Sequence, residues 1–393
     1  MTELIIFVNA VLLSYFFLND ACMYLQKLSL NNFKNYEQVQ FTFSDKLNCF
    51  VGNNGVGKTN LLDAVYYLSI TKSYFNSIDS QNIRHGSEYF IIKGTFPTED
   101  KDEVFTCSVQ KTKNKKFSRN KKNYKRLADH IGFIPVVMVS PADSALVNEG
   151  SEERRKFIDA VISQYDRPYL EDLISYNKAL KQRNILLKNF FRDGKFSESS
   201  LELWDQQMIG PATRIHKKRV DFVEQLIPGF QKYYLLISEG KEVVSLKYRS
   251  QLDTISMIDL LEANREKDRI LQYTSGGIHK DDLELKLNDY PIKKVGSQGQ
   301  LKTYLVSLKL AKFDFVKERT GRTPIFLMDD IFDKFDAGRV KQIIQIISDS
   351  AYGQIFITDT HQTRLEDMLE NQNVNYKVFK INDEISEIDS KDS

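Results

Sequence analysis

The chain contains few cysteines for its 393 residues, and this scarcity excludes several classes of protein. Its three cysteines, Cys22, Cys49 and Cys107, form no C-x-x-C pair. So small and odd a set rules out a disulfide framework and a cysteine zinc site, and we expect buried or idle thiols. Hydrophobic residues make up 41% and charged residues 27% of the chain, which excludes global disorder and predicts a globular protein of two or three domains.

Long apolar runs are equally scarce. The one candidate, Leu4 to Leu18, has 15 residues, whereas a helix that spans a bilayer needs about 20. No Lys or Arg precedes it, so the basic start of a signal peptide is missing. We expect residues 1–22 to be an extension outside the fold, which begins with the strand-like run after Met23. No other stretch is apolar enough to span a membrane, so we expect a cytoplasmic protein without a membrane partner.

The net charge is only +2, but the positive charge is concentrated in one segment. Residues 111–126 carry nine Lys or Arg and no acid, and the rest of the chain carries 46 basic and 53 acidic residues. Phe117 and Tyr124 lie among these cations. Such a strip is typical of contacts to nucleic-acid phosphates, and a solvated β-hairpin is the alternative. The candidate DNA contacts are Lys111, Lys113, Lys115, Lys116, Arg119, Lys121, Lys122 and Lys125.

Residues 52–59, with the sequence GNNGVGKT, match the phosphate-binding pattern GxxxxGK[ST]. The pattern lies between the apolar strand candidate Leu47–Val51 and an amphipathic helical run, the context that a P-loop requires. Backbone N–H groups of such a loop converge on phosphates, Lys58 reaches the β- and γ-phosphates, and Thr59 offers its hydroxyl to Mg²⁺. The expected ATP contacts here are Gly52, Asn53, Asn54, Gly55, Val56, Gly57, Lys58, Thr59 and Asn60.

Two acids end a second apolar strand candidate, Ile325–Met328. In P-loop ATPases the first acid at such a strand end holds Mg²⁺, so Asp329 is the expected metal partner of Thr59. The second acid, Asp330, is placed to position or deprotonate the attacking water. We therefore expect Asp330 and Lys58 among the catalytic residues.

A third motif, Ser297-Gln-Gly-Gln300, precedes a helical run and taken alone predicts only a helix cap. Its place in the order of motifs resembles that of ABC-type ATPases, in which a signature serine and helix N-terminus complete the partner's ATP site. This resemblance implies that Ser297 acts in catalysis and that Ser297, Gly299 and Gln300 contact ATP in a two-fold dimer.

Three further positions fit the same arrangement. Asp336 corresponds to the loop that crosses the dimer axis, and His361 to the switch that contacts the γ-phosphate, with Thr360 as its competitor. Residues Asn32–Asn35 of the first hairpin candidate, Lys34 among them, are candidate nucleotide contacts, and a surface turn is the alternative.

Strand and helix signals alternate at both ends of the chain and flank a charged helical middle. This pattern predicts a wound α/β fold with an inserted helical arm. The resemblance in motif order implies, more closely, a P-loop NTPase of ABC-ATPase type, similar to the heads of SMC proteins. We expect the head to comprise residues 23–143 and 272–393, and the mainly helical insertion residues 144–271.

With these motifs in place, the chain resembles the RecF family of bacterial DNA replication and repair ATPases. The likeness rests on five segments in family order. They are Tyr24–Tyr36, Ser140–Asp159, Leu180–Asn184, Thr274–Asp282 and Ser297–Gln300. Lys34 stands where the family usually has arginine, and Ile278 where it has proline, so a bidentate contact at position 34 is not expected.

The resemblance implies ATP-controlled DNA binding. ATP is expected to dimerise the heads around Mg²⁺-bound nucleotide, and the homodimer to clamp double-stranded DNA at gaps or junctions with single strands. RecR and RecO are the implied partners in loading RecA onto single-stranded DNA, and slow ATP hydrolysis is implied to release the clamp.

Other ATPases share some of these motifs. A transporter subunit places its signature much closer to the P-loop, whereas Ser297 lies 238 positions beyond Thr59 here. An SMC-like protein with long arms needs heptads that residues 151–236 do not show. A small-molecule kinase does not require a signature helix such as the one that Ser297 precedes.

Overall fold

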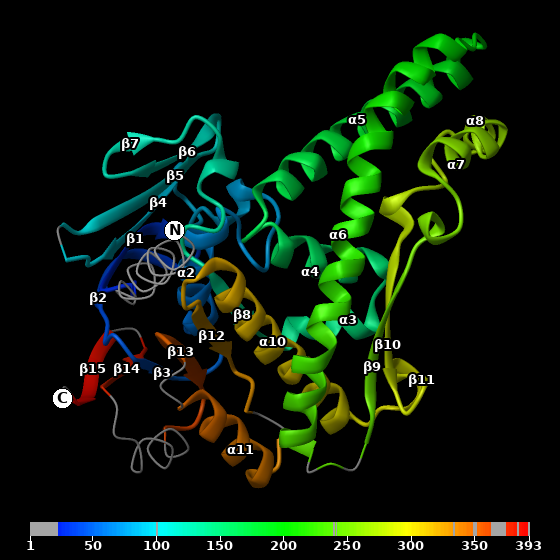
Figure 1. Cartoon of the computed structure of the whole chain (residues 1–393). Helices are drawn as coiled ribbons and strands as arrows, with labels where there is room; N and C mark the ends of the chain where they lie inside the picture. Colours follow the sequence, from blue (N-terminus) through cyan, green and yellow to red (C-terminus); the bar gives the residue numbers. More distant parts are fainter. Residues whose placement is uncertain are drawn as a thin grey trace, which may run out of the picture.

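The computed structural model describes residues 23–391 apart from 100, 239, 241, 333–334, 349–351, 363–374 and 383–384. The expected extension 1–22 lies outside these described residues. Three sheets and a set of long helices make up the described part, and the pair α5 and α6 extends beyond the sheets (Figure 1).

A six-stranded, mostly parallel sheet forms the centre. Its strands, in spatial order, are β15 (Ile385–Lys391), β14 (Tyr376–Ile381), β3 (Leu47–Val51), β13 (Ile355–Asp359), β12 (Ile325–Asp329) and β8 (Val136–Val139). Only β15 runs antiparallel to its neighbour. Both faces are covered, so β12 is apolar at every position before its terminal acid, as buried parallel strands are.

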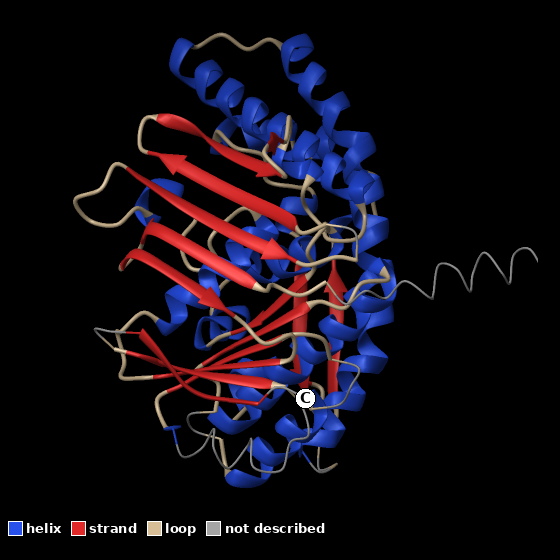
Figure 2. Ribbon diagram, turned by 90° about the vertical axis from the view of Figure 1, so that its left-hand side faces the viewer, coloured by secondary structure: helices blue, strands red, loops and turns tan. Residues whose placement is uncertain are grey.

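Successive residues of these strands enter two different cores. In β12, Phe326 and Met328 pack with the long helices, whereas Ile325 and Leu327 pack on the opposite face. This alternation follows from the two-residue period of a strand. The central sheet thus separates the helical layer from a second sheet (Figure 2).

The second sheet has six antiparallel strands. In spatial order they are β2 (Tyr36–Thr42), β1 (Lys27–Phe33), β4 (Tyr89–Phe96), β5 (Glu103–Gln110), β6 (Lys113–Arg119) and β7 (Lys122–Asn123). Its inner face packs with α2 (Lys58–Ile70), where Phe33 contacts the rings of Tyr67 and Phe90 edge-on. One face is buried and the other polar, as the alternating pattern predicts.

The helical layer covers the other face of the central sheet. Its members are α3 (Ala145–Asn148), α4 (Ser151–Ile162), α5 (Arg167–Asp193), α6 (Glu198–Ser238), α10 (Gln298–Thr320) and α11 (Ala337–Ile347). Helices α5 and α6 have 27 and 41 residues, which correspond to about 40 Å and 60 Å. Phe222 and Phe230 of α6 contact Phe315 and Tyr304 of α10, so the arm is anchored on the helix that follows the Ser297 motif.

A small antiparallel sheet and short helices complete the described structure. They are β9 (Val244–Arg249), β10 (Asp282–Leu287), β11 (Tyr290–Pro291), α7 (Met257–Ala263), α8 (Arg265–Leu271) and α9 (Ile292–Val295). Strand β9 comes from the segment expected to be the insertion and pairs with β10 from the segment expected to be the head. This pairing crosses the expected boundary between insertion and head, and the domain division stays a prediction. No helix in the described part of the chain is long and apolar enough to cross a membrane.

Candidate nucleotide-binding site

The P-loop lies between β3 and α2, and its glycines are required by the backbone. Gly52, Gly55 and Gly57 have φ values of 154°, 86° and 114°. A Cβ at Gly52 would lie 2.2 Å from the carbonyl oxygen of Ile381, and one at Gly57 would lie 2.4 Å from the Asn35 amide nitrogen. A side chain does not fit at Gly52 or Gly57, and at Gly55 the positive φ favours glycine.

Lys58 curls back over this loop. Its ammonium donates hydrogen bonds to the carbonyl oxygens of Gly52 and Asn53, at 2.6 and 3.0 Å. Burial lowers the pKa of Lys58, while the carboxylates of Asp330, Asp329 and Asp359 oppose this shift. The ammonium therefore lies where the ends of β3, β12 and β13 meet.

Thr59 and Asp329 face each other across these strand ends. The Thr59 hydroxyl lies 2.9 and 3.0 Å from the two carboxylate oxygens of Asp329. Burial raises the pKa of Asp329, whereas its hydrogen bonds from Thr358 and Thr59 lower it. The two residues expected to hold Mg²⁺ are thus in direct contact.

Thr358 is a residue that the sequence analysis missed. Its hydroxyl donates to Asp329 at 2.9 Å and accepts from the backbone N–H of Asp330, also at 2.9 Å. Asp330 itself has a positive φ of 46°, uncommon for a residue other than glycine. Thr358 therefore fixes both acids, and the pairing of parallel strands β12 and β13 is the signal that identifies it.

The switch candidates follow β13. The backbone N–H of His361 donates to the carboxylate of Asp359 at 2.8 Å, and the His361 side chain is exposed while Thr360 is half-buried. Asp359 is also part of the charge around Lys58. The structure places the segment beside the nucleotide site and leaves the choice between His361 and Thr360 a prediction.

The first hairpin contacts the P-loop through residues next to Lys34. The ammonium of Lys34 pairs with the buried carboxylate of Asp63 in α2, at 2.6 Å. Asn35 instead donates to the carbonyl of Val56 at 3.0 Å and accepts from Asn60 at 2.8 Å, and the Tyr36 hydroxyl donates to the carbonyl of Gly57. Asn35 belongs to the hairpin segment expected to contact nucleotide, whereas sequence reasoning did not assign Tyr36; both support the loop directly.

The Ser297 motif caps α10. The Ser297 hydroxyl accepts from the N–H of Gln300, and the Gln300 side chain accepts from the N–H of Ser297, which is a capping box. Ser297 is exposed, and Gly299 lies beside Arg339 of α11, whose first turn is capped by Asp336. Among the described residues, no hydrogen bond or ion pair joins Ser297, Gly299 or Gln300 to the P-loop of the same chain.

The basic strip forms β6, β7 and their turns, and its side chains fall into two groups. Lys115 is 9% exposed and pairs with Asp79 at 2.8 Å, and Arg119 forms a bidentate pair with Glu103. Phe117 is a core residue. Lys111 is exposed, and its ammonium pairs with the carboxylate of Glu88. The exposed lysines for which the structure gives no ion pair are Lys113, Lys116, Lys121, Lys122 and Lys125.

The residues present fit ATP and Mg²⁺. Glycine backbone and Lys58 form a phosphate cradle at the N-terminus of α2, whose dipole favours anions. A hydroxyl and a carboxylate are the oxygen ligands that Mg²⁺ prefers when substrate phosphates and water supply the rest. The described residues contain no cluster of three or more His, Cys, Asp or Glu side chains suited to a metal.

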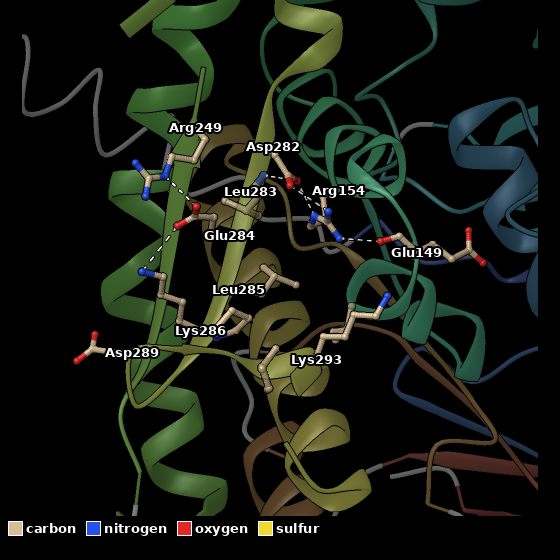
Figure 3. A pocket seen from close by; sticks show the side chains of 13 residues that line it. Glu149, Arg154, Arg249, Asp282, Leu283, Glu284, Leu285, Lys286, Asp289 and Lys293 are labelled. Carbon is tan, nitrogen blue, oxygen red and sulfur yellow. Dashed lines mark hydrogen bonds and ion pairs between the residues drawn. The ribbon is translucent and has the colours of Figure 1, made fainter. Parts of the chain in front are cut away.

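A separate pocket of about 480 Å³ lies between β10, α9 and the start of α4 (Figure 3). Arg154 binds Asp282 across it, with 2.6 Å between Nε and the carboxylate, and Arg249 binds Glu284 at 2.9 Å. None of its lining residues belongs to the P-loop. The pocket is therefore separate from the candidate nucleotide site.

Comparison with known proteins agrees with this geometry. The profile of the RecF/RecN/SMC N-terminal domain matches residues 24–387. A DNA replication and repair protein RecF from Bacteroides thetaiotaomicron is 52% identical over 362 residues, covering 91% of this chain and 97% of the relative. The RecF protein from Phocaeicola vulgatus is 51% identical over 364 residues, covering 92% and 97%.

This chain belongs to the RecF family. A solved structure of the recombination mediator protein RecF with ATP, in the RecFOR pathway, superimposes with a TM-score of 0.84 at 29% identity and covers 94% of this chain and 98% of that one. An SMC head domain with an extended coiled coil superimposes with a TM-score of 0.54 at 18% identity, covering 93% and 96%, which shows the shared fold alone. The predicted ABC-type ATPase head fold is confirmed.

Proposed function

We propose that this RecF-family chain is a DNA-binding ATPase whose two-fold dimer encloses two ATP molecules and clamps DNA near gaps or junctions. The observation that carries the proposal is the contact between Thr59 and Asp329, which joins the two halves of an ATP site. The Ser297 cap is exposed, and within the described part of the chain no hydrogen bond or ion pair joins it to its own P-loop, which supports completion of that site by a second copy.

Each residue has a distinct task in this proposal. P-loop N–H groups and Lys58 bind the β- and γ-phosphates, and Thr59 with Asp329 holds Mg²⁺, which supplies charge neutralisation when bound. Asp330 positions or deprotonates the attacking water. The partner's Ser297, at the positive end of α10, contacts the γ-phosphate, and His361 or Thr360 senses it.

DNA binding is assigned to the exposed lysines of the strip, because Lys115 and Arg119 are engaged within the fold. Phosphate contacts of this kind bind strongly and without sequence preference. The related RecF structure is described as that of a recombination mediator in the RecFOR pathway. We extend this role to the present chain, with RecR and RecO as partners in RecA loading and slow ATP hydrolysis as the release step.

The test is binding of purified protein to gapped DNA with ATP, with ADP, and with ATP in the Lys58→Met variant. We expect tight binding that requires ATP and is lost in Lys58→Met. Lys267→Met, at an exposed position of α8, is the matched control and should bind like the unmodified chain. Binding that is indifferent to nucleotide and to Lys58 would contradict the clamp, and absence of any DNA binding would contradict the function.

A further inference from the structure

Arg339 lies against the glycine of the Ser297 motif. A Cβ at Gly299 would be 2.6 Å from Nη1 of Arg339 and 3.8 Å from its Cζ. Arg339 belongs to the first turn of α11, whereas Gly299 belongs to the first turn of α10. The guanidinium therefore packs on the backbone of the turn that presents Ser297.

The same arginine is tied to the segment that follows β12. Its backbone N–H donates to Asp336 at 2.9 Å, and its Nε lies 3.5 Å from the second oxygen of the Asp336 carboxylate. Nearby, the Lys302 ammonium of α10 lies 5.6 Å from the centre of the Phe335 ring. The first two turns of α10 thus contact the segment around the start of α11 at two points.

The carboxylate of Glu242 also contacts the turn that presents Ser297. The Gln300 side chain donates to one oxygen of Glu242, and the Tyr234 hydroxyl donates to the other. Burial and Glu242 raise the pKa of Tyr234, whereas the charge of Arg339 lowers it. The contacts of Gln300 and Tyr234 with Glu242 thus tie the turn to α6, while Arg339 contacts it from α11.

We propose that Arg339 is a positioning residue of the partner's ATP site. It holds the Ser297 turn and Asp336 as one unit, so that both enter the second copy's site together. The inference rests on the proposed function, because it requires that ATP be shared between two chains. The side chain of Arg339 is 28% exposed, so it also contributes positive charge to the surface that the partner's phosphates approach.

The first experiment compares Arg339→Ala with Lys341→Ala, an exposed position two residues further along α11. A fluorescent ATP analogue measures nucleotide binding to the monomer, and analytical ultracentrifugation measures ATP-dependent dimerisation. We expect Arg339→Ala to keep nucleotide affinity and to weaken dimerisation about tenfold or more, the usual cost of removing a charged hydrogen-bonding group. Lys341→Ala should change neither.

The packing of Arg339 on the turn is tested with Gly299→Ala. Its methyl group collides with Arg339 and should weaken dimerisation in the unmodified chain, but should have little additional effect in Arg339→Ala, because the guanidinium is already absent. Additive effects of the two substitutions would overturn the assignment. Unfolding measurements on each variant separate this effect on dimerisation from a general loss of stability.

Action in trans is tested by mixing Arg339→Ala with Lys58→Met. In the mixed dimer the intact P-loop faces a motif that keeps Arg339, so ATPase activity should rise above that of either variant alone. No recovery would mean that Arg339 serves its own chain and would overturn the inference. Absence of ATP-dependent dimers in the unmodified chain would instead contradict the proposed function, so the two failures are distinguishable.

Discussion

The hydroxyl of Thr59 lies 2.9 Å from a carboxylate oxygen of Asp329, although 270 positions separate the two residues. They meet because β3 and β12 both run parallel to β13, between them, so that their carboxyl ends lie at one edge of the sheet. Loops at this edge are where ligands bind in open α/β sheets. The following predictions test the site and the framework that holds it.

Thr358 should be needed for ATP hydrolysis. Thr358→Val removes the hydroxyl that donates to Asp329 and leaves the Asp330 N–H without its acceptor. We expect kcat to fall by about 10–100-fold, the usual cost of losing a group that orients a metal ligand, with little change in ATP affinity. Thr358→Ser keeps the hydroxyl and is the matched control. Equal kcat in the valine variant and the unmodified chain would contradict the role.

The exposed lysines of the strip should control DNA affinity. We expect Lys→Gln substitution at Lys113, Lys116, Lys121 and Lys122 to weaken binding and to lower the slope of log K against log salt by about one for each phosphate that no longer binds a lysine. The same change at exposed lysines of the helices, Lys181, Lys188, Lys232 and Lys267, is the control. An unchanged slope in the strip variant would exclude the strip from DNA binding.

Lys115 should affect stability instead of DNA affinity. Its ammonium pairs with Asp79 at 2.8 Å and hydrogen-bonds the carbonyl oxygen of Thr71. Lys115→Met leaves Asp79 without this pair, so we expect a lower urea midpoint and an unchanged salt slope for DNA binding. A large loss of DNA affinity with an unchanged midpoint would place Lys115 on the binding surface after all.

Arg183 should anchor the helical arm. It is buried, pairs with Asp205 at 2.5 Å and with Asp268 at 2.6 Å, and donates to Thr274 at 2.9 Å. Arg183→Met leaves two buried carboxylates without their partner, and we expect a loss of about 3–5 kcal/mol in the free energy of unfolding. Urea denaturation measures it. Arg192→Met, at the exposed end of α5, is the control and should leave the midpoint unchanged.

Stability should decrease on mild acidification. Burial lowers the pKa of His130 to about 4 and that of His279 to about 4. Both values lie below the unfolded value of about 6.5, so the unfolded chain binds protons first and stability is lost as pH falls from about 6.5 towards 4. Urea midpoints across this range should fall less steeply in His279→Gln than in the unmodified chain. The exposed His85→Gln is the control, and identical slopes in all three would contradict the prediction.

Much of the candidate site was predictable because its motifs are local. The P-loop pattern, the acid pair after an apolar strand and the capping box each depend on neighbours within a few residues. The site residues that were not predicted depend on contacts between distant segments. Thr358 and Tyr36 carry no motif, and they matter because β13 and the first hairpin pack against the P-loop.

In the basic strip, too, charge composition did not predict the direction of each side chain. Counting charges assigned Lys115 to DNA, but the two-residue period of β6 places it on the same face as the core residue Phe117. Lys116, on the opposite face, is exposed, and Lys113 is exposed on the same face as Lys115 because it lies at the start of the strand. Charge composition identified the segment, whereas the direction of each side chain required the sheet.

The P-loop, the acid pair, the expected pairing of Thr59 with Asp329 and the helix that Ser297 caps could be predicted from sequence, because loop conformation and capping depend on nearby residues. The contacts of Thr358 with both acids and of Arg339 with Gly299 emerge only from the folded chain. Such contacts depend on the packing of whole strands and helices, which no local pattern specifies.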